Sequence, residues 1–283
     1  MSLNAQNSES SIDLVFQREN PVGNVPLVYT NCRRATVDIT TPRSRLPPPA
    51  NLRLSFSLGQ EIGKGTVGRV FEVNIIPSAS SSRLQGRILP PLAVKICRRS
   101  MVNTLLPEAQ NYVEMEMLQG HVIPRCYGLY SATIPDDMAF SPWVGDVVRS
   151  RSRDQHKLEE ELLGPNVVTI LLMERVGGLV PPQLFTNPSI LPEIQAMYKD
   201  ISLMGIYHAD MAANNVVFAP KHPALPVRTS PHWTQRYQFR IIDFHHAFKV
   251  NLTHPTIAGD HFAELKMVLQ EALGDLHKQP EQL

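Results

Sequence analysis

Residues 208–215 carry side chains that can move a proton and hold a metal ion. The segment places His208, Asp210 and Asn215 in the pattern H-x-D-x-x-x-x-N, directly after a helical stretch. A carboxylate that faces a hydroxyl can orient it and take its proton, and an amide oxygen five residues later can ligate Mg²⁺. The pattern therefore predicts proton-transfer and metal-binding chemistry in one loop.

A second carboxylate, Asp243, follows the apolar segment 239–242. It supplies an anionic oxygen of the kind that bridges magnesium to phosphate oxygens. His245 and His246 stand beside it and invite an interpretation as a metal cluster. We set that interpretation aside, because neither an H-x-x-x-H spacing nor a cysteine accompanies the two histidines.

Three glycines, Gly63, Gly65 and Gly68, precede Val70 in a G-x-G-x-x-G-x-V pattern. Glycines let a backbone approach phosphates without a clash from Cβ. The alternation of residues 69–75 predicts a strand after the turn, whereas a dinucleotide-binding turn requires a helix there and a P-loop requires Ser or Thr after Gly-Lys. A phosphate-covering hairpin is therefore preferred, and an ordinary hairpin turn stays open as the alternative.

Lys95 lies in an otherwise apolar strand, where an ammonium is costly unless a phosphate or a carboxylate pairs with it. It is the best candidate to hold the α- and β-phosphates of a nucleotide, although a lysine on an edge strand with its head in water is the alternative. Its possible partners on the next helix are Glu108, Glu114 and Glu116. Glu108 is preferred, because the residues after it keep the usual distance to the next strand, near Val122.

Hydrophobic periodicity predicts the elements that would position these side chains. Alternating or continuous apolar runs predict strands at 52–58, 69–75, 92–96, 167–173, 215–218 and 239–242. Apolar stripes at helical spacing predict helices at 107–119, 191–205 and 258–273. Paired glycines at 177–178 mark a turn and a possible hinge. Three consecutive strands followed by a helix-biased second half predict an α+β fold.

The composition describes an ordinary globular protein. The chain has 283 residues, 43% of them apolar and 19% charged, and its 27 basic and 26 acidic residues give no overall attraction to nucleic acid or anionic membrane. Three scattered cysteines suggest neither a disulfide framework nor a zinc knuckle. The longest apolar run is far shorter than the roughly 20 residues of a membrane helix. We expect an intracellular protein, cytoplasmic or nuclear and not secreted, with no nucleic-acid or membrane partner.

The order of the motifs resembles the protein kinase superfamily over positions 52–247, and in particular the small kinase-like proteins common in fungi. The resemblance implies a two-lobed α+β fold with an antiparallel sheet in its small lobe. The expected domains are a flexible N-terminal extension at 1–51, a small lobe at 52–176 with an insertion at 131–165, and a shortened helical large lobe at 177–283.

The same resemblance implies the roles of individual residues. The nucleotide-binding set would be Ile62, Gly63, Gly65, Gly68, Val70, Ala93, Lys95, Glu108, Met173, Glu174 and Val176. Met173 would be the gatekeeper, and the backbone of Glu174 and Val176 would bind adenine.

The catalytic set that the resemblance implies is Asp210 as the base, with Lys95 and Asn215. Asn215 and Asp243 would hold magnesium. The expected cofactors are ATP and Mg²⁺, and the expected reaction moves the γ-phosphate to a hydroxyl, of Ser or Thr in a protein.

Some positions depart from the kinase pattern. Ala209 replaces the arginine found in kinases switched by activation-loop phosphorylation, and His245 stands where a glycine is expected. The segment Ala212–Asn214 lacks a cation to steady the phosphoryl group. Only 40 residues (283 minus 243) follow Asp243, and no A-P-E segment appears among them. Two alternatives stay open: a small-molecule phosphotransferase of the aminoglycoside or choline kinase kind, and a nucleotide-binding pseudokinase that acts as an interaction module.

Overall fold

The computed structural model describes most of the chain from residue 54 onward. The described ranges are 2–4, 11–13, 17–19, 27–28, 54–65, 67–76, 90–97, 102–133, 167–222 and 236–278. The expected insertion at 131–165 lies outside these ranges after residue 133, as does most of the expected extension at 1–51.

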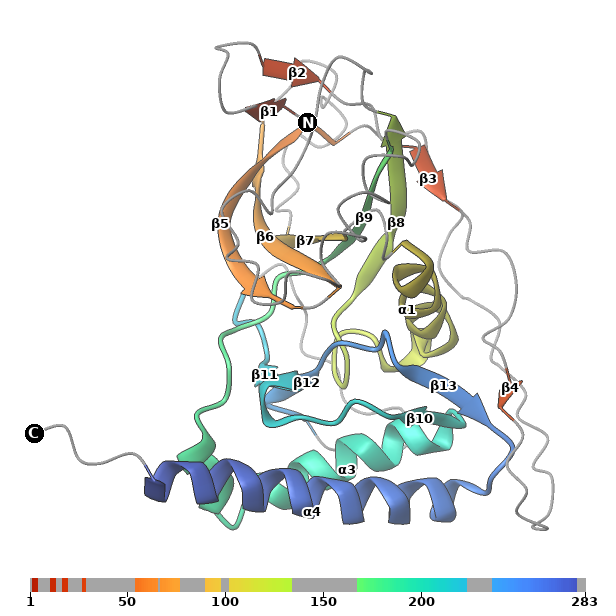
Figure 1. Cartoon of the computed structure of the whole chain (residues 1–283), viewed down its shortest axis with the longest axis vertical. Coiled ribbons are helices and arrows are strands. Elements are labelled where there is room, and N and C mark those ends of the chain that lie inside the picture. The colour runs from red at the N-terminus through yellow and green to blue at the C-terminus, as the bar shows by residue number, and fades with distance from the viewer. Residues whose placement is uncertain are drawn as a thin grey trace, which may run out of the picture. The chain divides into compact units, whose positions relative to one another are not determined.

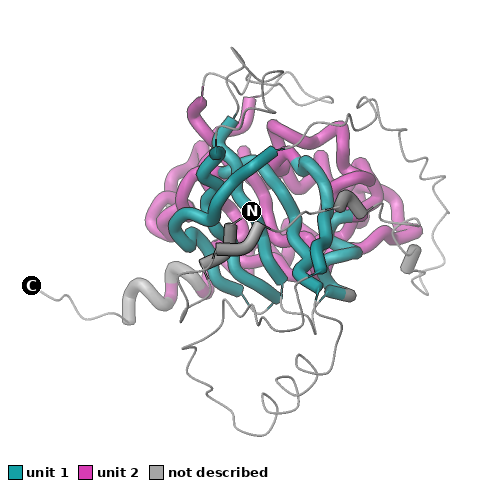
Figure 2. Tube along the Cα trace, turned by 90° about the horizontal axis from the view of Figure 1, so that it is seen from above, with its two compact units in different colours: residues 1–22, 46–109, 126–175 teal, residues 23–45, 110–125, 176–283 magenta. Residues whose placement is uncertain are grey.

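The described chain divides into two compact units, coloured separately in Figure 2. Unit 1 contains residues 1–22, 46–109 and 126–175, and unit 2 contains residues 23–45, 110–125 and 176–283. The segment 110–125, which the sequence analysis assigned to the small lobe, groups with unit 2. A second division between the units falls after Arg175.

Unit 1 is built on an antiparallel sheet (Figure 1). Its five main strands, in spatial order, are β5 (Phe56–Lys64), β6 (Gly68–Ile75), β7 (Leu92–Cys97), β9 (Val167–Glu174) and β8 (Cys126–Thr133). Three short strands extend its edges: β1 (Ser2–Asn4) and β2 (Ser11–Asp13) beside β5, and β3 (Gln17–Glu19) beside β8. The main strands form because their β-branched and aromatic residues alternate between two faces.

One face of this sheet carries the hydrophobic core of unit 1. Its buried members are Phe56, Val94, Ile96, Ala132, Val168 and Ile170, with Leu54, Leu58, Phe71, Val73 and Tyr130 packed against them. Because side chains on a strand alternate, the residues between these positions point to the opposite face. Lys95, between Val94 and Ile96, therefore lies on that opposite face.

The helix α1 (Val102–Glu114) follows β7 and continues into a 3₁₀ turn at Glu116–Leu118. The sequence prediction of a helix at 107–119 was wrong at its start, because Pro107 lies inside α1 and does not begin it. Proline removes one backbone hydrogen bond from a helix interior, and α1 accommodates this loss. The division between the units falls within α1, after Ala109.

Unit 2 consists of helices and short strand pairs. Helix α3 (Ile190–Leu203) packs against α4 (His254–Lys278), as Figure 1 shows. Strand β10 (Ile206–His208) pairs with β13 (Ala247–Val250), which pairs in turn with β4 (Leu27–Val28). Strands β11 (Val216–Phe218) and β12 (Phe239–Ile241) form a separate antiparallel pair. Short 3₁₀ turns lie at Pro182–Thr186 and Ala213–Asn215.

The α+β class predicted from the sequence is confirmed. The predicted strands and helices are all present with shifted ends, whereas β8, β10 and β13 were not predicted at their positions. The four short strands β1 to β4 were not predicted either, and they lie in the segment 1–51 that was expected to be a flexible extension. The strand expected near Val122 begins instead at Cys126. None of the helices in the described ranges combines the length and the apolar character needed to cross a membrane.

Candidate functional site

Lys95 and Glu108 form a buried ion pair in unit 1. The Lys95 ammonium donates to Glu108 Oε2 at 2.7 Å, and the two residues are 7% and 1% exposed. Strand β7 carries the lysine and the first half of α1 carries the glutamate. The structure thus pairs Lys95 with the glutamate that the sequence analysis preferred. Glu114 instead pairs with Lys249, in unit 2.

Several expected nucleotide-binding residues share one face of the unit 1 sheet. Val70 lies directly opposite Lys95 across β6 and β7, and Ala93 lies opposite Met173 across β7 and β9. Ala93 and Lys95 are two residues apart on the same strand, so they point to the same face. The sheet register therefore groups Val70, Ala93, Lys95 and Met173 opposite the hydrophobic core.

The three glycines lie where β5 turns into β6: Gly63 near the end of β5, Gly65 in the turn, and Gly68 at the start of β6. The Gly65 amide donates to the Gly68 carbonyl at 2.9 Å, and Arg69 binds Glu61 at 2.6 Å across the two strands. A Cβ on Gly68 would lie 2.2 Å from the Ile96 carbonyl oxygen, so that glycine is required by the packing of β6 on β7. A Cβ on Gly65 would meet no described atom closer than 3.9 Å. Packing therefore does not explain the glycine at Gly65.

The end of β9 contains the expected gatekeeper and adenine-binding backbone. Glu174 is buried and pairs with Leu92, and the next amide, that of Arg175, donates to the Pro91 carbonyl at 2.9 Å. Val176 belongs to unit 2, one residue beyond the division. On β5, the expected nucleotide-binding residue Ile62 is 41% exposed.

In unit 2, the pairing of β11 with β12 places Asn215 beside Ile242, the residue before Asp243. Asn215 precedes β11, and its carbonyl accepts from the Ile242 amide at 3.0 Å. Its side-chain amide donates to the Asp210 carbonyl at 2.8 Å. Asn215 therefore links the backbone at Asp210 to the backbone at Ile242, 32 positions later in the sequence (242 minus 210).

The backbone at Asp243 is held in a conformation that few residues adopt. Its φ is 68°, the left-handed region, and it is the one non-glycine residue with positive φ in the described ranges. That conformation costs roughly 1–2 kcal/mol for a residue with a Cβ. His208 binds the Asp243 carbonyl through Nε2 at 2.9 Å. The next residue, Phe244, is fully buried, with its ring edge-on to Tyr112. Unit 2 thus fixes this carboxylate loop on both sides.

A chain of buried hydrogen bonds connects the backbone of His208 to α3 and α4. Its backbone amide donates to His261 Nε2 at 3.0 Å, so the neutral His261 ring carries its proton on Nδ1, which faces Ser202 Oγ at 3.0 Å. The serine hydroxyl in turn donates to the Tyr198 carbonyl at 2.8 Å. Burial, followed by the charge of His208, lowers the pKa of His261 to about 3. Burial also lowers the pKa of His208.

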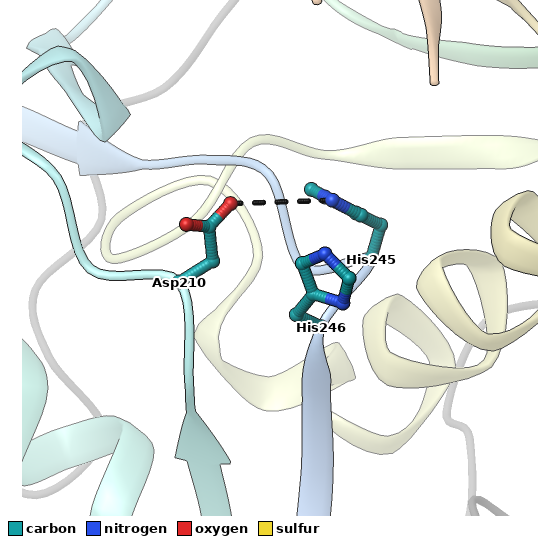
Figure 3. Close-up of side chains that lie close together, drawn as sticks. All are labelled: Asp210, His245 and His246. Atoms are coloured by element: carbon teal, nitrogen blue, oxygen red, sulfur yellow. Dashed lines mark ion pairs between the residues drawn. The ribbon is translucent and has the colours of Figure 1, made fainter. Parts of the chain in front are cut away.

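Asp210 lies beside the two histidines that the sequence analysis set aside. Its Oδ2 lies 4.0 Å from His245 Nε2, and one potential ligand atom from each of Asp210, His245 and His246 lies within 4.8 Å of the others. Figure 3 shows the carboxylate turned toward the His245 ring, with His246 next to it. His245 Nδ1 binds Asp243 Oδ1 at 2.8 Å.

Sequence reasoning missed this grouping, because the partner of the two histidines lies 35 residues before His245 (245 minus 210). The spacing of residues near the two histidines gives no sign of this partner.

A scan against known protein families and a search of curated proteins found no match. The functional assignment therefore depends on the residues and their geometry.

Proposed function

We propose that this chain is an ATP- and Mg²⁺-dependent phosphotransferase of the protein kinase type, with a two-lobed kinase-like fold. It would transfer the γ-phosphate of ATP to a hydroxyl group, of Ser or Thr in a protein. The proposal combines the residues of unit 1 that suit phosphate binding with the residues of unit 2 that suit proton transfer and metal binding.

The observation that carries the proposal is the linked arrangement of Asp210, Asn215 and Asp243. Asn215 binds the backbone on both sides, at Asp210 and at Ile242, while His208 binds the Asp243 carbonyl. These bonds hold the backbone segments that carry two carboxylates and an amide, which suits phosphoryl transfer, because the reaction depends on alignment and on neutralising charge.

Lys95 would hold the α- and β-phosphates. Its ion pair with Glu108 fixes the ammonium on the sheet face that also carries Val70, Ala93 and Met173. The small and apolar members of that face would leave room for the nucleotide. At Gly65 the absence of a side chain would let the backbone amides approach the phosphates closely.

The residues of unit 2 fit a magnesium ion. Carboxylate and amide oxygens are the ligands that Mg²⁺ accepts, and Asn215 and Asp243 supply one of each. The bond from His245 to one Asp243 oxygen is compatible with metal binding, because a carboxylate offers two oxygens with several lone pairs. When bound, the ion would neutralise charge on the β- and γ-phosphates.

Asp210 would act on the acceptor. Its carboxylate takes the proton of the acceptor hydroxyl as the hydroxyl oxygen bonds to the γ-phosphorus. The bond from that phosphorus to the bridging oxygen of ADP breaks, so the products are ADP and the phosphorylated acceptor. The Asp210 side chain is 46% exposed, which allows an external acceptor to reach it.

A small-molecule acceptor is the second candidate. Of the described elements after Asp243, β13 pairs with β10 and α4 packs against α3, so both are engaged within unit 2. A screen of radiolabelled γ-phosphate transfer onto peptides and onto hydroxylated metabolites distinguishes the two acceptor classes.

The test of the enzyme itself is Asp210→Asn. We expect this variant to bind ATP with Mg²⁺, measured by a rise in melting temperature, and to lose transfer by at least about 100-fold, the lower end of general-base contributions. Asp260→Asn, at an exposed position on α4, is the matched control and should transfer normally. Unchanged transfer by Asp210→Asn would exclude Asp210 as the base. A wild-type chain that binds ATP without transferring phosphate would instead be a pseudokinase.

A further inference from the structure

Unit 2 holds a second group of potential metal ligands, and most of these ligands are not the oxygen atoms that a magnesium site requires. We infer that Asp210, His245 and His246 form a site for a divalent transition-metal ion of the zinc class. The three side chains present one ligand atom each within 4.8 Å of one another (Figure 3). Two of the three atoms are imidazole nitrogens, which Mg²⁺ disfavours and which Zn²⁺, Co²⁺, Ni²⁺ and Cu²⁺ favour.

His245 is oriented for metal binding by a second carboxylate. Its Nδ1 lies 2.8 Å from Asp243 Oδ1, so the neutral ring donates its Nδ1 proton there and keeps a lone pair on Nε2. Nε2 is the atom that faces Asp210. A carboxylate behind a ligating histidine is the usual support of zinc ligands, since it fixes the tautomer and raises the basicity of the ring.

The distances fit a bridging ion better than a hydrogen bond. His245 Nε2 and Asp210 Oδ2 are 4.0 Å apart, beyond hydrogen-bond range. Two ligands on a tetrahedral zinc lie about 3.4 Å from each other when each is about 2.1 Å from the metal. The remaining adjustment is about 0.6 Å for this pair (4.0 minus 3.4), and at most about 1.4 Å for a pair at the 4.8 Å limit (4.8 minus 3.4). It can come from Asp210, whose side chain is 46% exposed, and from His246, which is also exposed.

The charge of the cluster is also suitable. Asp210 as a ligand and Asp243 behind His245 bring two negative charges to the site, which balance a divalent ion, while the two imidazoles are neutral ligands. Three protein ligands leave the fourth tetrahedral position for water, as in open zinc sites.

Metal binding here would compete with the function proposed for Asp210. Its carboxylate cannot take a proton while it ligates a zinc-class ion, so the ion would inhibit phosphate transfer. This consequence depends on the proposed function, whereas the metal site itself does not.

The experiment titrates Zn²⁺ into the full chain without nucleotide, in excess Mg²⁺, against a chromophoric zinc chelator. We expect one equivalent of Zn²⁺ to bind, and His246→Ala to weaken binding by at least about tenfold, as expected for loss of one ligand. Asp243→Asn should weaken it by about 10- to 100-fold through loss of the support for His245. His254→Ala, an exposed histidine at the start of α4, is the matched control and should bind as the wild type does.

Two results would overturn the inference: no stoichiometric zinc binding by the wild-type chain, or equal binding by His246→Ala. Because His246 is exposed, its replacement should leave the fold intact, which circular dichroism verifies. Cobalt absorption gives a second readout, since tetrahedral coordination by these ligands should produce a visible band that His245→Ala abolishes. Failure of ATP to bind would contradict the proposed phosphotransferase and would leave this result unaffected.

Discussion

At the scale of single residues, two buried lysines can be compared within the same chain. Lys95 pairs with Glu108 in unit 1, and Lys249 pairs with Glu114 in unit 2, and all four residues are less than 9% exposed. Burying an ion pair is costly, and removing one partner leaves an uncompensated charge. Both pairs therefore support stability in the same way, whereas we propose a nucleotide-binding role for Lys95 alone.

We expect Lys95→Met and Lys249→Met to destabilise the chain similarly, by about 3–5 kcal/mol in the free energy of unfolding. Lys95→Met should in addition weaken ATP binding by about 10- to 100-fold, because a hydrogen bond to a charged group contributes about 1.5–3 kcal/mol. Denaturant titration and calorimetric ATP titration on folded samples measure the two effects.

The double variant Lys95→Met with Glu108→Met is the control for this comparison. It removes both charges, so it should recover most of the lost stability without recovering ATP affinity. Equal ATP affinity of Lys95→Met and Lys249→Met would show that Lys95 is a structural lysine.

The buried histidines give a pH dependence whose direction follows from their pKa. The pKa of His261 falls from an ordinary 6.5 to about 3 in the folded state, chiefly by burial and then by the charge of His208. Between pH 6.5 and pH 3, the His261 ring is therefore protonated in the unfolded chain and neutral in the folded chain. The stabilising contribution is present above pH 6.5 and is lost as pH falls toward 3, by about 1.4 kcal/mol per pH unit.

We expect the free energy of unfolding to fall by about 2 kcal/mol between pH 6.5 and pH 5.0 from His261 alone. The lowered pKa of His208 adds to the loss. The variant His261→Gln should have a lower free energy of unfolding at pH 7.5, because it loses the hydrogen bonds to Ser202 and His208. Its free energy of unfolding should, however, change less with pH. Equal pH dependence of the two proteins in denaturant titrations would disprove this account.

At the scale of elements, the β5–β6 turn shows that one motif can hold glycines for different reasons. Gly68 must lack a side chain because the backbone of β7 passes 2.2 Å from where its Cβ would stand. No such contact restricts Gly65, and its φ lies outside the left-handed region. The fold therefore does not require a glycine at position 65. A phosphate bound close to the backbone would explain the missing side chain.

We expect Gly68→Ala to destabilise unit 1 by about 1–3 kcal/mol, the usual cost of overpacking. Gly65→Ala should leave stability within about 0.5 kcal/mol and weaken ATP binding, measured by thermal melting with and without nucleotide. Gly259→Ala on α4, which meets nothing within 4 Å, is the control that should leave ATP affinity unchanged. Full ATP affinity in Gly65→Ala would remove the glycine turn from the proposed site.

At the scale of the whole molecule, the proposed residues are distributed over both units. Unit 1 carries Lys95 and Glu108, and unit 2 carries Asp210, Asn215 and Asp243. A phosphotransferase needs both sets for one nucleotide, so binding experiments on variants of each unit test the proposal as a whole.

We expect Lys95→Met to weaken ATP binding with or without Mg²⁺, because in the proposed site the ammonium would contact phosphate directly. Asp243→Asn should weaken only the binding of ATP with Mg²⁺, since its carboxylate would act through the ion. Calorimetric titrations with ATP in Mg²⁺ and in a chelator measure both. If Asp243→Asn binds Mg²⁺-ATP as tightly as the wild type does, Asp243 takes no part in nucleotide binding.

Much of the fold could be predicted from local patterns, and the errors have physical causes. Alternation located β6, because a half-buried strand exposes its period directly in the sequence, whereas β7, which is buried along its whole length, was located by its nearly continuous apolar run. Strands β10 and β13 are three and four residues long, and they are held by pairing with each other, which leaves too short a period to detect. Pro107 misplaced the start of α1, since proline is favoured at helix starts yet can be accommodated inside.

The sequence by itself determined the chemical types: a lysine in an apolar strand, a carboxylate and an amide five residues apart, and a carboxylate after a buried strand. It also favoured Glu108 over Glu114 and Glu116, although the strand used for that choice begins at Cys126 and not near Val122. Only the tertiary structure decided which distant side chains meet. The approach of Asp210 to His245 depends on the pairing of β10 with β13 and of β11 with β12, and contacts of that range leave no periodic trace in the chain.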